Sequence, residues 1–97
     1  MISSNTYKVT SWIEQYIPEK ERDPMNTCIK LSEEVSELLH ALYSGEGDVG
    51  HELADVYILI LDIAHLKGYD LQVEFNKKMV INRARTWSQD KGALSHD

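Results

Sequence analysis

Apolar residues recur at helical spacing in four segments of this chain, and polar or glycine-containing stretches separate them. The clearest apolar stripe, in the second segment, alternates steps of three and four residues: Cys28, Leu31, Val35, Leu38 and Leu42. That spacing is typical of an amphipathic helix. The run VYILIL at 56–61 has the composition of a buried strand, but its flanks continue the helical pattern and the whole apolar stretch is too long for an ordinary strand. We therefore interpret it as part of a buried helix.

Four helices are predicted, with these approximate bounds: Thr6–Ile17, Asp23–Ser44, Asp48 or Val49 to Lys67, and Asp70–Trp87. Asp23 suits an N-cap and Pro24 the first helical position, while Gly68 is a natural stop. We expect an all-α fold, built as an antiparallel bundle. A single domain is expected, with a core over about 6–87 and a loose tail at 88–97.

Composition and charge narrow the class of protein. The chain has 97 residues, 42% of them hydrophobic and 27% charged, which is ordinary for a folded domain. Its net charge of −6 argues against a partner that is a nucleic acid polymer. No apolar run is long enough to span a membrane, and MISSNTYKVT lacks the apolar centre of a signal peptide. With Cys28 as the single cysteine, we expect a protein of the reducing cytoplasm.

Two pairs of acids stand beside the apolar stripes of the second and third helices. Glu34 and Glu37 are three residues apart, so they share one helix face, and Glu52 and Asp55 repeat the arrangement. Pairing of the two helices through their stripes would bring four carboxylates together. Asp62 lies two turns beyond Asp55 on the same face, and its role stays open.

Gathered carboxylates repel one another, and each unpaired buried charge costs several kcal/mol. Apart from histidines, the third helix offers no basic residue before Lys67. A divalent cation offsets the repulsion, and ligands that are all carboxylates favour Mg²⁺ or Mn²⁺ over Zn²⁺. The alternative is that these acids form a solvated helix face, as glutamates usually do. The acids within the apolar third segment favour the metal site.

The pattern EExxE at 33–37, followed by ExxD at 52–55 and a basic segment ending in NRARTW at 82–87, resembles the MazG-like nucleotide pyrophosphohydrolases. The likeness covers about residues 25–87. Within that family, the chain resembles the short, single-domain members. It implies hydrolysis of a nucleoside triphosphate, usually deoxy or non-standard, to the monophosphate and pyrophosphate. It also implies a bundle completed between protomers, as a homodimer or homotetramer.

The resemblance further implies roles for individual acids. Glu34, Glu37, Glu52 and Asp55 match the family's metal ligands, for Mg²⁺ with Mn²⁺ as a possible substitute. Glu33 is an additional acid that binds a further ion or helps to activate water, and we place it with Glu34 as catalytic. Attack of water on an α-phosphate suits this chemistry without a serine or cysteine nucleophile.

A basic face on the fourth helix is a candidate for binding phosphates. Lys78, Asn82 and Arg85 follow at helical spacing, with Arg83 beside them. The alternative is a solvated basic helix end, favoured by the helix dipole. Two more candidates lie elsewhere: Lys30, one turn before Glu34, and Trp12, which either stacks on a base or packs in the core.

Two other functions remain open at this point. A phosphoribosyl-ATP pyrophosphatase has a similar motif, so sequence separates it only imperfectly from the first hypothesis. A non-catalytic helical oligomer would use the same acids to hold a structural ion.

Overall fold

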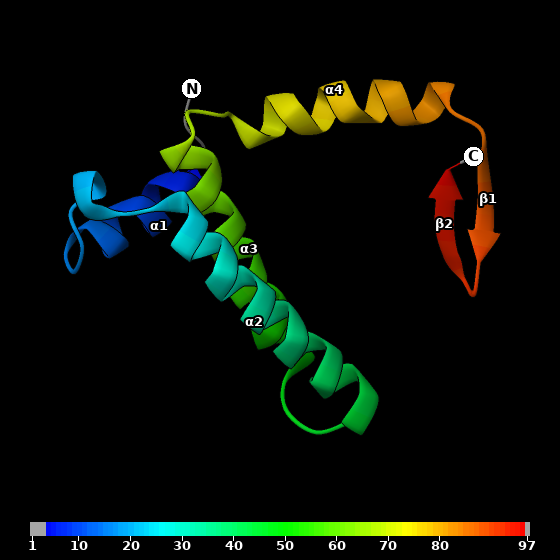
Figure 1. The fold of residues 1–97 in the computed structure, drawn as a ribbon, viewed down its shortest axis with the longest axis horizontal. Coiled ribbons are helices and arrows are strands. Elements are labelled where there is room, and N and C mark those ends of the chain that lie inside the picture. Colours follow the sequence, from blue (N-terminus) through cyan, green and yellow to red (C-terminus); the bar gives the residue numbers. More distant parts are fainter. Residues whose placement is uncertain (1–3, 97) are drawn as a thin grey trace.

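The computed structural model describes residues 4–96, and it is all-α apart from a small hairpin of strands at its end (Figure 1). The elements in chain order are α1 (Ser4–Glu14), a 3₁₀ turn η1 (Glu19–Glu21), α2 (Pro24–Ser44), α3 (Val49–Leu66), α4 (Leu71–Ala84), β1 (Trp87–Asp90) and β2 (Ala93–His96). The predicted all-α class with four helices is confirmed. Each helix is close to its predicted bounds, but α1 and α4 end three residues early.

The starts of three helices follow from side-chain caps. The carboxylate of Asp23 accepts a hydrogen bond from the backbone N–H of Met25, with Pro24 in the first helical position. Asp48 and Asp70 cap α3 and α4 in the same way. Each carboxylate satisfies a backbone donor that has no partner within the helix. After α2, Gly45 adopts φ 73°, a left-handed conformation that favours glycine, and the chain turns back.

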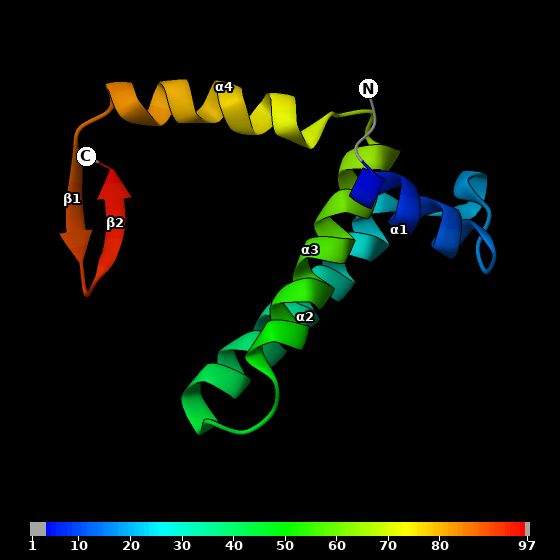
Figure 2. The ribbon, with the colours of Figure 1, turned by 180° about the vertical axis from the view of Figure 1, so that it is seen from behind.

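Helices α2 and α3 form an antiparallel pair that runs side by side in both views (Figures 1 and 2). Helix α1 packs against α3. The apolar core is small, because the buried apolar side chains of residues 4–96 are only Val9, Ala41, Leu61 and Ala64. In the predicted stripe of α2, Leu31 and Leu38 are half-buried, whereas Val35 and Leu42 are exposed. One chain therefore covers only part of the apolar face that its sequence pattern marks.

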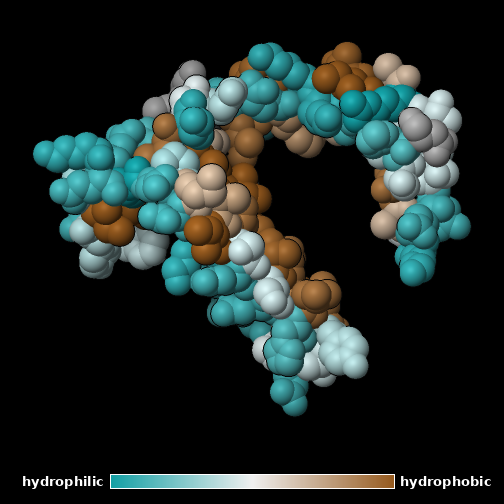
Figure 3. All heavy atoms as spheres, viewed as in Figure 1, coloured by the Kyte–Doolittle hydropathy of each residue, from teal (hydrophilic) through white to brown (hydrophobic). Residues whose placement is uncertain are grey.

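Helix α4 leaves the end of α3 at a sharp angle and lies apart from the α2–α3 pair in both views (Figures 1 and 2). The predicted bundle thus holds for α2 and α3 with α1 across them, while α4 projects as an arm. Phe75 of α4 is 58% exposed. Hydrophobic atoms line the side of the α2–α3 pair that faces the hollow under α4 (Figure 3).

The residues after α4 differ most from the prediction. Trp87 was expected to end the fourth helix and 88–97 to form a loose tail, but Trp87–Asp90 pairs antiparallel with Ala93–His96. The indole N–H of Trp87 donates a hydrogen bond to the backbone carbonyl of Asn82. The rings of Trp87 and His96 pack edge to face, with 5.5 Å between their centroids. The turn places Lys91 and Gly92 at positive φ, a conformation that glycine adopts freely and lysine rarely does. We did not foresee this hairpin because its strands show no alternating apolar pattern.

Within the described residues, no helix is long and apolar enough to cross a membrane.

Candidate active site

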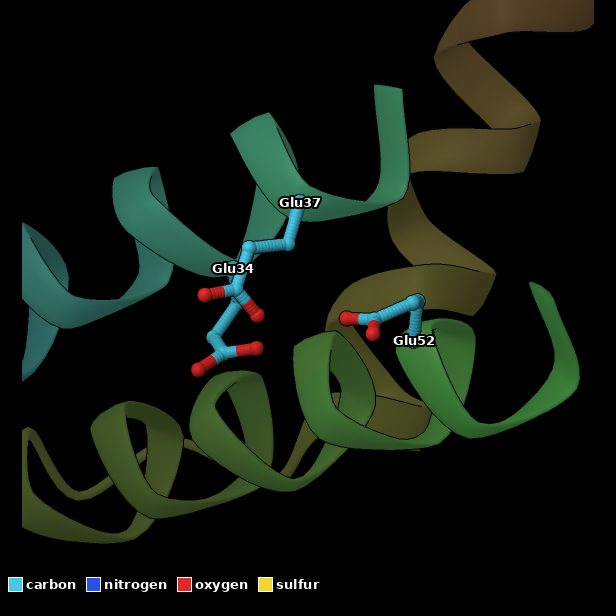
Figure 4. Close-up of side chains that lie close together, drawn as sticks. All are labelled: Glu34, Glu37 and Glu52. Atoms are coloured by element: carbon cyan, nitrogen blue, oxygen red, sulfur yellow. The ribbon is translucent and has the colours of Figure 1, made fainter. Parts of the chain in front are cut away.

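Three carboxylates meet between α2 and α3. Glu34 and Glu37 project from α2 and Glu52 from the first turn of α3, and one oxygen from each lies within 4.8 Å of the others (Figure 4). The three-residue spacing of Glu34 and Glu37 places them on one helix face, and the antiparallel pairing brings Glu52 opposite them. We call this group the carboxylate cluster.

The cluster is electrostatically unfavourable as it stands. Oε2 of Glu34 and Oε2 of Glu52 are both shielded from solvent, and neither has a hydrogen-bond partner among residues 4–96. Burial raises the pKa of Glu34 above its ordinary value of 4.5, and the nearby charges of Glu37, Asp55 and Glu52 raise it further. A hydrogen bond between the carboxyl groups of Glu34 and Glu37 also favours the protonated form of Glu34. Buried oxygens without donors are the arrangement that a bound cation satisfies.

Two acids of the predicted site stand at the edge of the cluster. Asp55 lies one turn after Glu52 and is close enough to raise the pKa of Glu34, but it is exposed and its oxygens lie outside the tight group. Glu33 is also exposed, and it forms an ion pair with Lys30 at 3.1 Å. Lys30 therefore pairs with Glu33 in this structure.

A cleft of about 730 Å³ opens beside the cluster. We call it the α2–α3 cleft, and its lining residues are Glu33, Ser36, Glu37, His40, Ala41, Glu46, Gly47 and Glu52. Its volume falls in the range of about 300–1,000 Å³ that is common for small-molecule sites.

The other predicted substrate-binding residues do not line this cleft. Lys78 and Asn82 belong to α4, Arg83 lies in its last turn and Arg85 at its end, so all four sit on the arm that projects away from the α2–α3 pair (Figure 1). Trp12 belongs to α1 and is 53% exposed. Its ring packs edge to face with that of Tyr16, with 6.1 Å between the ring centroids. A single chain thus brings the acids together but keeps the basic face and Trp12 away from them.

Asp62, whose role was open, is buried at 2% exposure and faces Arg22, with 3.6 Å between Oδ1 and Nε. Arg22 is also bonded to the Glu14 carboxylate and to the backbone carbonyl of Ile17. His65 of α3 approaches Glu19 at 3.3 Å. These contacts fasten the segment between α1 and α2 to α3, so Asp62 is an anchor and not part of the cluster.

The structure defines an all-α protein in which three carboxylates gather between two antiparallel helices. The chain is 40% identical over 93 residues to a dATP/dGTP diphosphohydrolase of Cyanophage S-2L, covering 92% of this chain and 81% of that protein. A dATP/dGTP diphosphohydrolase of Salmonella phage PMBT28 is 37% identical over 89 residues, covering 91% of this chain but only 29% of that longer protein. The sequence matches no protein-family model.

A solved structure is similar over the whole chain. The Cyanophage S-2L MazG-like pyrophosphohydrolase, bound to dGDP and three catalytic Mn²⁺ ions per active site, superposes with a TM-score of 0.81 at 35% identity, covering 100% of this chain and 97% of that one. The chain belongs to the MazG-like nucleotide pyrophosphohydrolases. It is therefore a nucleotide-hydrolysing enzyme, as its motifs predicted.

Proposed function

We propose that this enzyme hydrolyses purine deoxynucleoside triphosphates to the monophosphate and pyrophosphate, using Mg²⁺ or, as a substitute, Mn²⁺. The names of the two phage relatives support the substrate class, and the Mn²⁺ ions of the solved relative support the divalent metal. The observation that carries the proposal is the carboxylate cluster, in which two shielded oxygens have no hydrogen-bond partner among residues 4–96. The single Cys28 supports action in the cytoplasm.

The residues of the cluster fit divalent cations. Glu34, Glu37 and Glu52 would hold an ion directly, and Asp55, one turn from Glu52, would contribute after a small side-chain movement. Oxygen donors without thiolate or imidazole suit Mg²⁺ and Mn²⁺. When bound, such ions neutralise the triphosphate and lower the pKa of a coordinated water.

The proposed reaction is the attack of a water on the α-phosphate of the nucleotide. The oxygen of a water forms a bond to the α-phosphorus, and the bond between that phosphorus and the α,β-bridging oxygen breaks. Pyrophosphate leaves with the bridging oxygen, and the nucleoside monophosphate keeps the water's oxygen. Glu33 accepts the water's proton, because its carboxylate lines the cleft with Glu37 and Glu52 and, within residues 4–96, is engaged only with Lys30. Glu34 would contribute by holding a cation in the carboxylate cluster beside the cleft.

A second copy of the chain supplies the basic residues in this proposal, as a homodimer or homotetramer. Lys78, Asn82, Arg83 and Arg85 are carried away from the cluster by α4, so phosphates bound at the cluster are reached from another protomer's arm. Exposed apolar side chains support this assembly. Val80 and Ile81 of α4 are 66% and 47% exposed, and Leu53 of α3 is 53% exposed. An isolated helix of about 14 residues and a lone hairpin are marginal in water, so both gain from a partner.

The alternative substrate, phosphoribosyl-ATP, has less support, because both relatives are named for dATP and dGTP. A structural ion without catalysis has less support still, because the chain belongs to an enzyme family.

The experiment is pyrophosphate release from a panel of dATP, dGTP, dCTP, dTTP, the ribonucleotides and phosphoribosyl-ATP, with Mg²⁺, Mn²⁺ or a chelator. The proposal expects the purine deoxynucleotides to be the best substrates and the chelator to abolish turnover. Cleavage of phosphoribosyl-ATP without cleavage of dATP and dGTP would refute the proposed substrate class. Full activity after chelation would refute the metal.

A further inference from the structure

The α2–α3 cleft is lined by both acidic and uncharged residues. Glu33, Glu37 and Glu52 make its wall strongly acidic beside the carboxylate cluster, and Ser36, Ala41 and Gly47 add uncharged surface. Glu46, on the turn between the helices, is a further acid and is exposed. A nucleoside triphosphate needs both kinds of surface, because its anionic phosphates need cations held by acids and its sugar and base need groups without net charge.

His40 is the aromatic side chain among the residues that line the cleft. It follows Glu37 by three residues on α2, a rise of about 4.5 Å along the helix axis, which keeps both side chains on one face. The residue is exposed, and nothing within residues 4–96 forms a hydrogen bond, ion pair or ring contact with its imidazole. By contrast, His51 pairs with Asp48 and His65 with Glu19. His40 therefore lines the cleft with its ring and both nitrogens available.

We infer that His40 is a specificity-determining residue that contacts the nucleoside of the substrate. The inference rests on the proposed function, which places the phosphates at the carboxylate cluster. A nucleotide held there extends along the cleft, and the imidazole one turn beyond Glu37 meets its sugar or base. The ring offers a stacking surface and a nitrogen that donates or accepts a hydrogen bond. Trp12, the other candidate for stacking, does not line this cleft.

The test compares His40→Ala and His40→Asn with a matched control, His51→Ala. His51 is nearby on α3 but lies outside the cleft lining, with its side chain 85% exposed. KM and kcat are measured for dATP, dGTP, dCTP and dTTP, and Mn²⁺ affinity is measured by calorimetry without nucleotide. We expect His40→Ala to raise the KM for the preferred nucleotides about tenfold or more, the size of one lost base contact. The ratio among the four bases should change, while kcat changes less than KM and Mn²⁺ affinity stays unchanged.

His40→Asn keeps a hydrogen-bonding group without the ring, so partial recovery indicates a polar contact and no recovery indicates stacking; both support the inference. The inference is overturned if wild type is active and His40→Ala matches His51→Ala in KM for all four bases. It is also overturned if His40→Ala weakens Mn²⁺ binding, because the residue would then serve the cations. A wild-type enzyme that cleaves none of these nucleotides refutes the proposed function itself, and the inference with it.

Discussion

Glu34 and Glu52 face each other from adjacent antiparallel helices, and each holds one shielded carboxylate oxygen without a hydrogen-bond partner in the described chain (Figure 4). Burial raises the pKa of Glu34, and repulsion from the charges of Glu37, Asp55 and Glu52 raises it further. The protein thus keeps an arrangement that costs stability in the absence of cations.

Removing the charge of Glu34 should separate activity from stability. We expect Glu34→Gln to lower kcat/KM about 100-fold or more, because the cluster loses a cation ligand. The melting temperature of the metal-free variant should equal or exceed that of wild type, because one repelling charge is gone. Glu21→Gln, an exposed acid of η1, is the control and should change neither quantity. A fully active Glu34→Gln variant would contradict the assignment of the cluster.

Cations should stabilise the folded protein in proportion to their occupancy. At a free Mn²⁺ concentration of about 100 times its Kd, linkage gives about 2.7 kcal/mol of added stability, provided the unfolded chain does not bind the ion. For a domain of this size each kcal/mol raises Tm by about 4–8 °C. Differential scanning fluorimetry with Mn²⁺, Mg²⁺ and a chelator measures the shift. Glu52→Gln should reduce it, and an equal shift in that variant would argue that the ions bind elsewhere.

The pH dependence of stability should have a definite sign. Because the folded-state pKa of Glu34 lies above its ordinary value of 4.5, the folded state binds this proton more tightly than the unfolded state. The contribution of Glu34 is therefore fully present below pH 4.5 and is lost as pH rises through the raised pKa. Comparing metal-free wild type with Glu34→Gln isolates this group, and the Tm difference should grow in favour of the variant as pH rises above 4.5. A difference that does not vary with pH would contradict the raised pKa.

If arms are exchanged between protomers, two inactive variants should restore each other. One carries Glu34→Gln and the other carries both Arg83→Ala and Arg85→Ala. In a mixed two-fold dimer one site receives both defects and the other receives none, so random mixing restores about a quarter of the wild-type sites. Activity is measured after the two proteins are unfolded and refolded together, with each variant refolded alone as the control. Activity no greater than the sum of the two separate controls would place the basic face in the same chain as its acids.

The Arg22–Asp62 pair should matter for stability and not for chemistry. Their side chains are 4% and 3% exposed, so Asp62→Ala removes the carboxylate beside the buried Nε of Arg22. Because Arg22 keeps its bonds to Glu14 and to the carbonyl of Ile17, the loss should cost about 1–3 kcal/mol in unfolding free energy. The double variant Arg22→Met with Asp62→Leu removes both charges and should recover most of that loss. Urea unfolding measures both, and Lys77→Ala, which breaks an exposed pair with Glu74, is the control. A double variant as unstable as Asp62→Ala would contradict this account.

Local signals in the sequence predicted the helices well, because their causes are local. Asp23, Asp48 and Asp70 cap helices through hydrogen bonds that reach two or three residues along the chain. The meeting of Glu34, Glu37 and Glu52 was also predictable, since helical spacing and antiparallel pairing suffice to place them. The roles of these residues as metal ligands, and of Asp55 beside them, stay predictions.

Features that depend on distant segments were not predictable. Asp62 is partnered by Arg22, 40 residues earlier in an irregular segment, and no periodicity links the two. The apolar residues of α4, such as Val80, indicate a buried face but do not specify which chain buries it. The hairpin of Trp87–Asp90 and Ala93–His96 has a different cause: its strands are short and show no alternating apolar pattern, so no local signal marks them.

The projecting arm has a consequence for how such an enzyme is controlled. If each site borrows its cationic half from a neighbour, a newly made copy has no complete site until it meets another. Catalysis would then begin only above a threshold of abundance, and specific activity would fall steeply on dilution without any inhibitor. The amount of protein synthesised would itself act as the switch that protects the nucleotide pool from premature destruction.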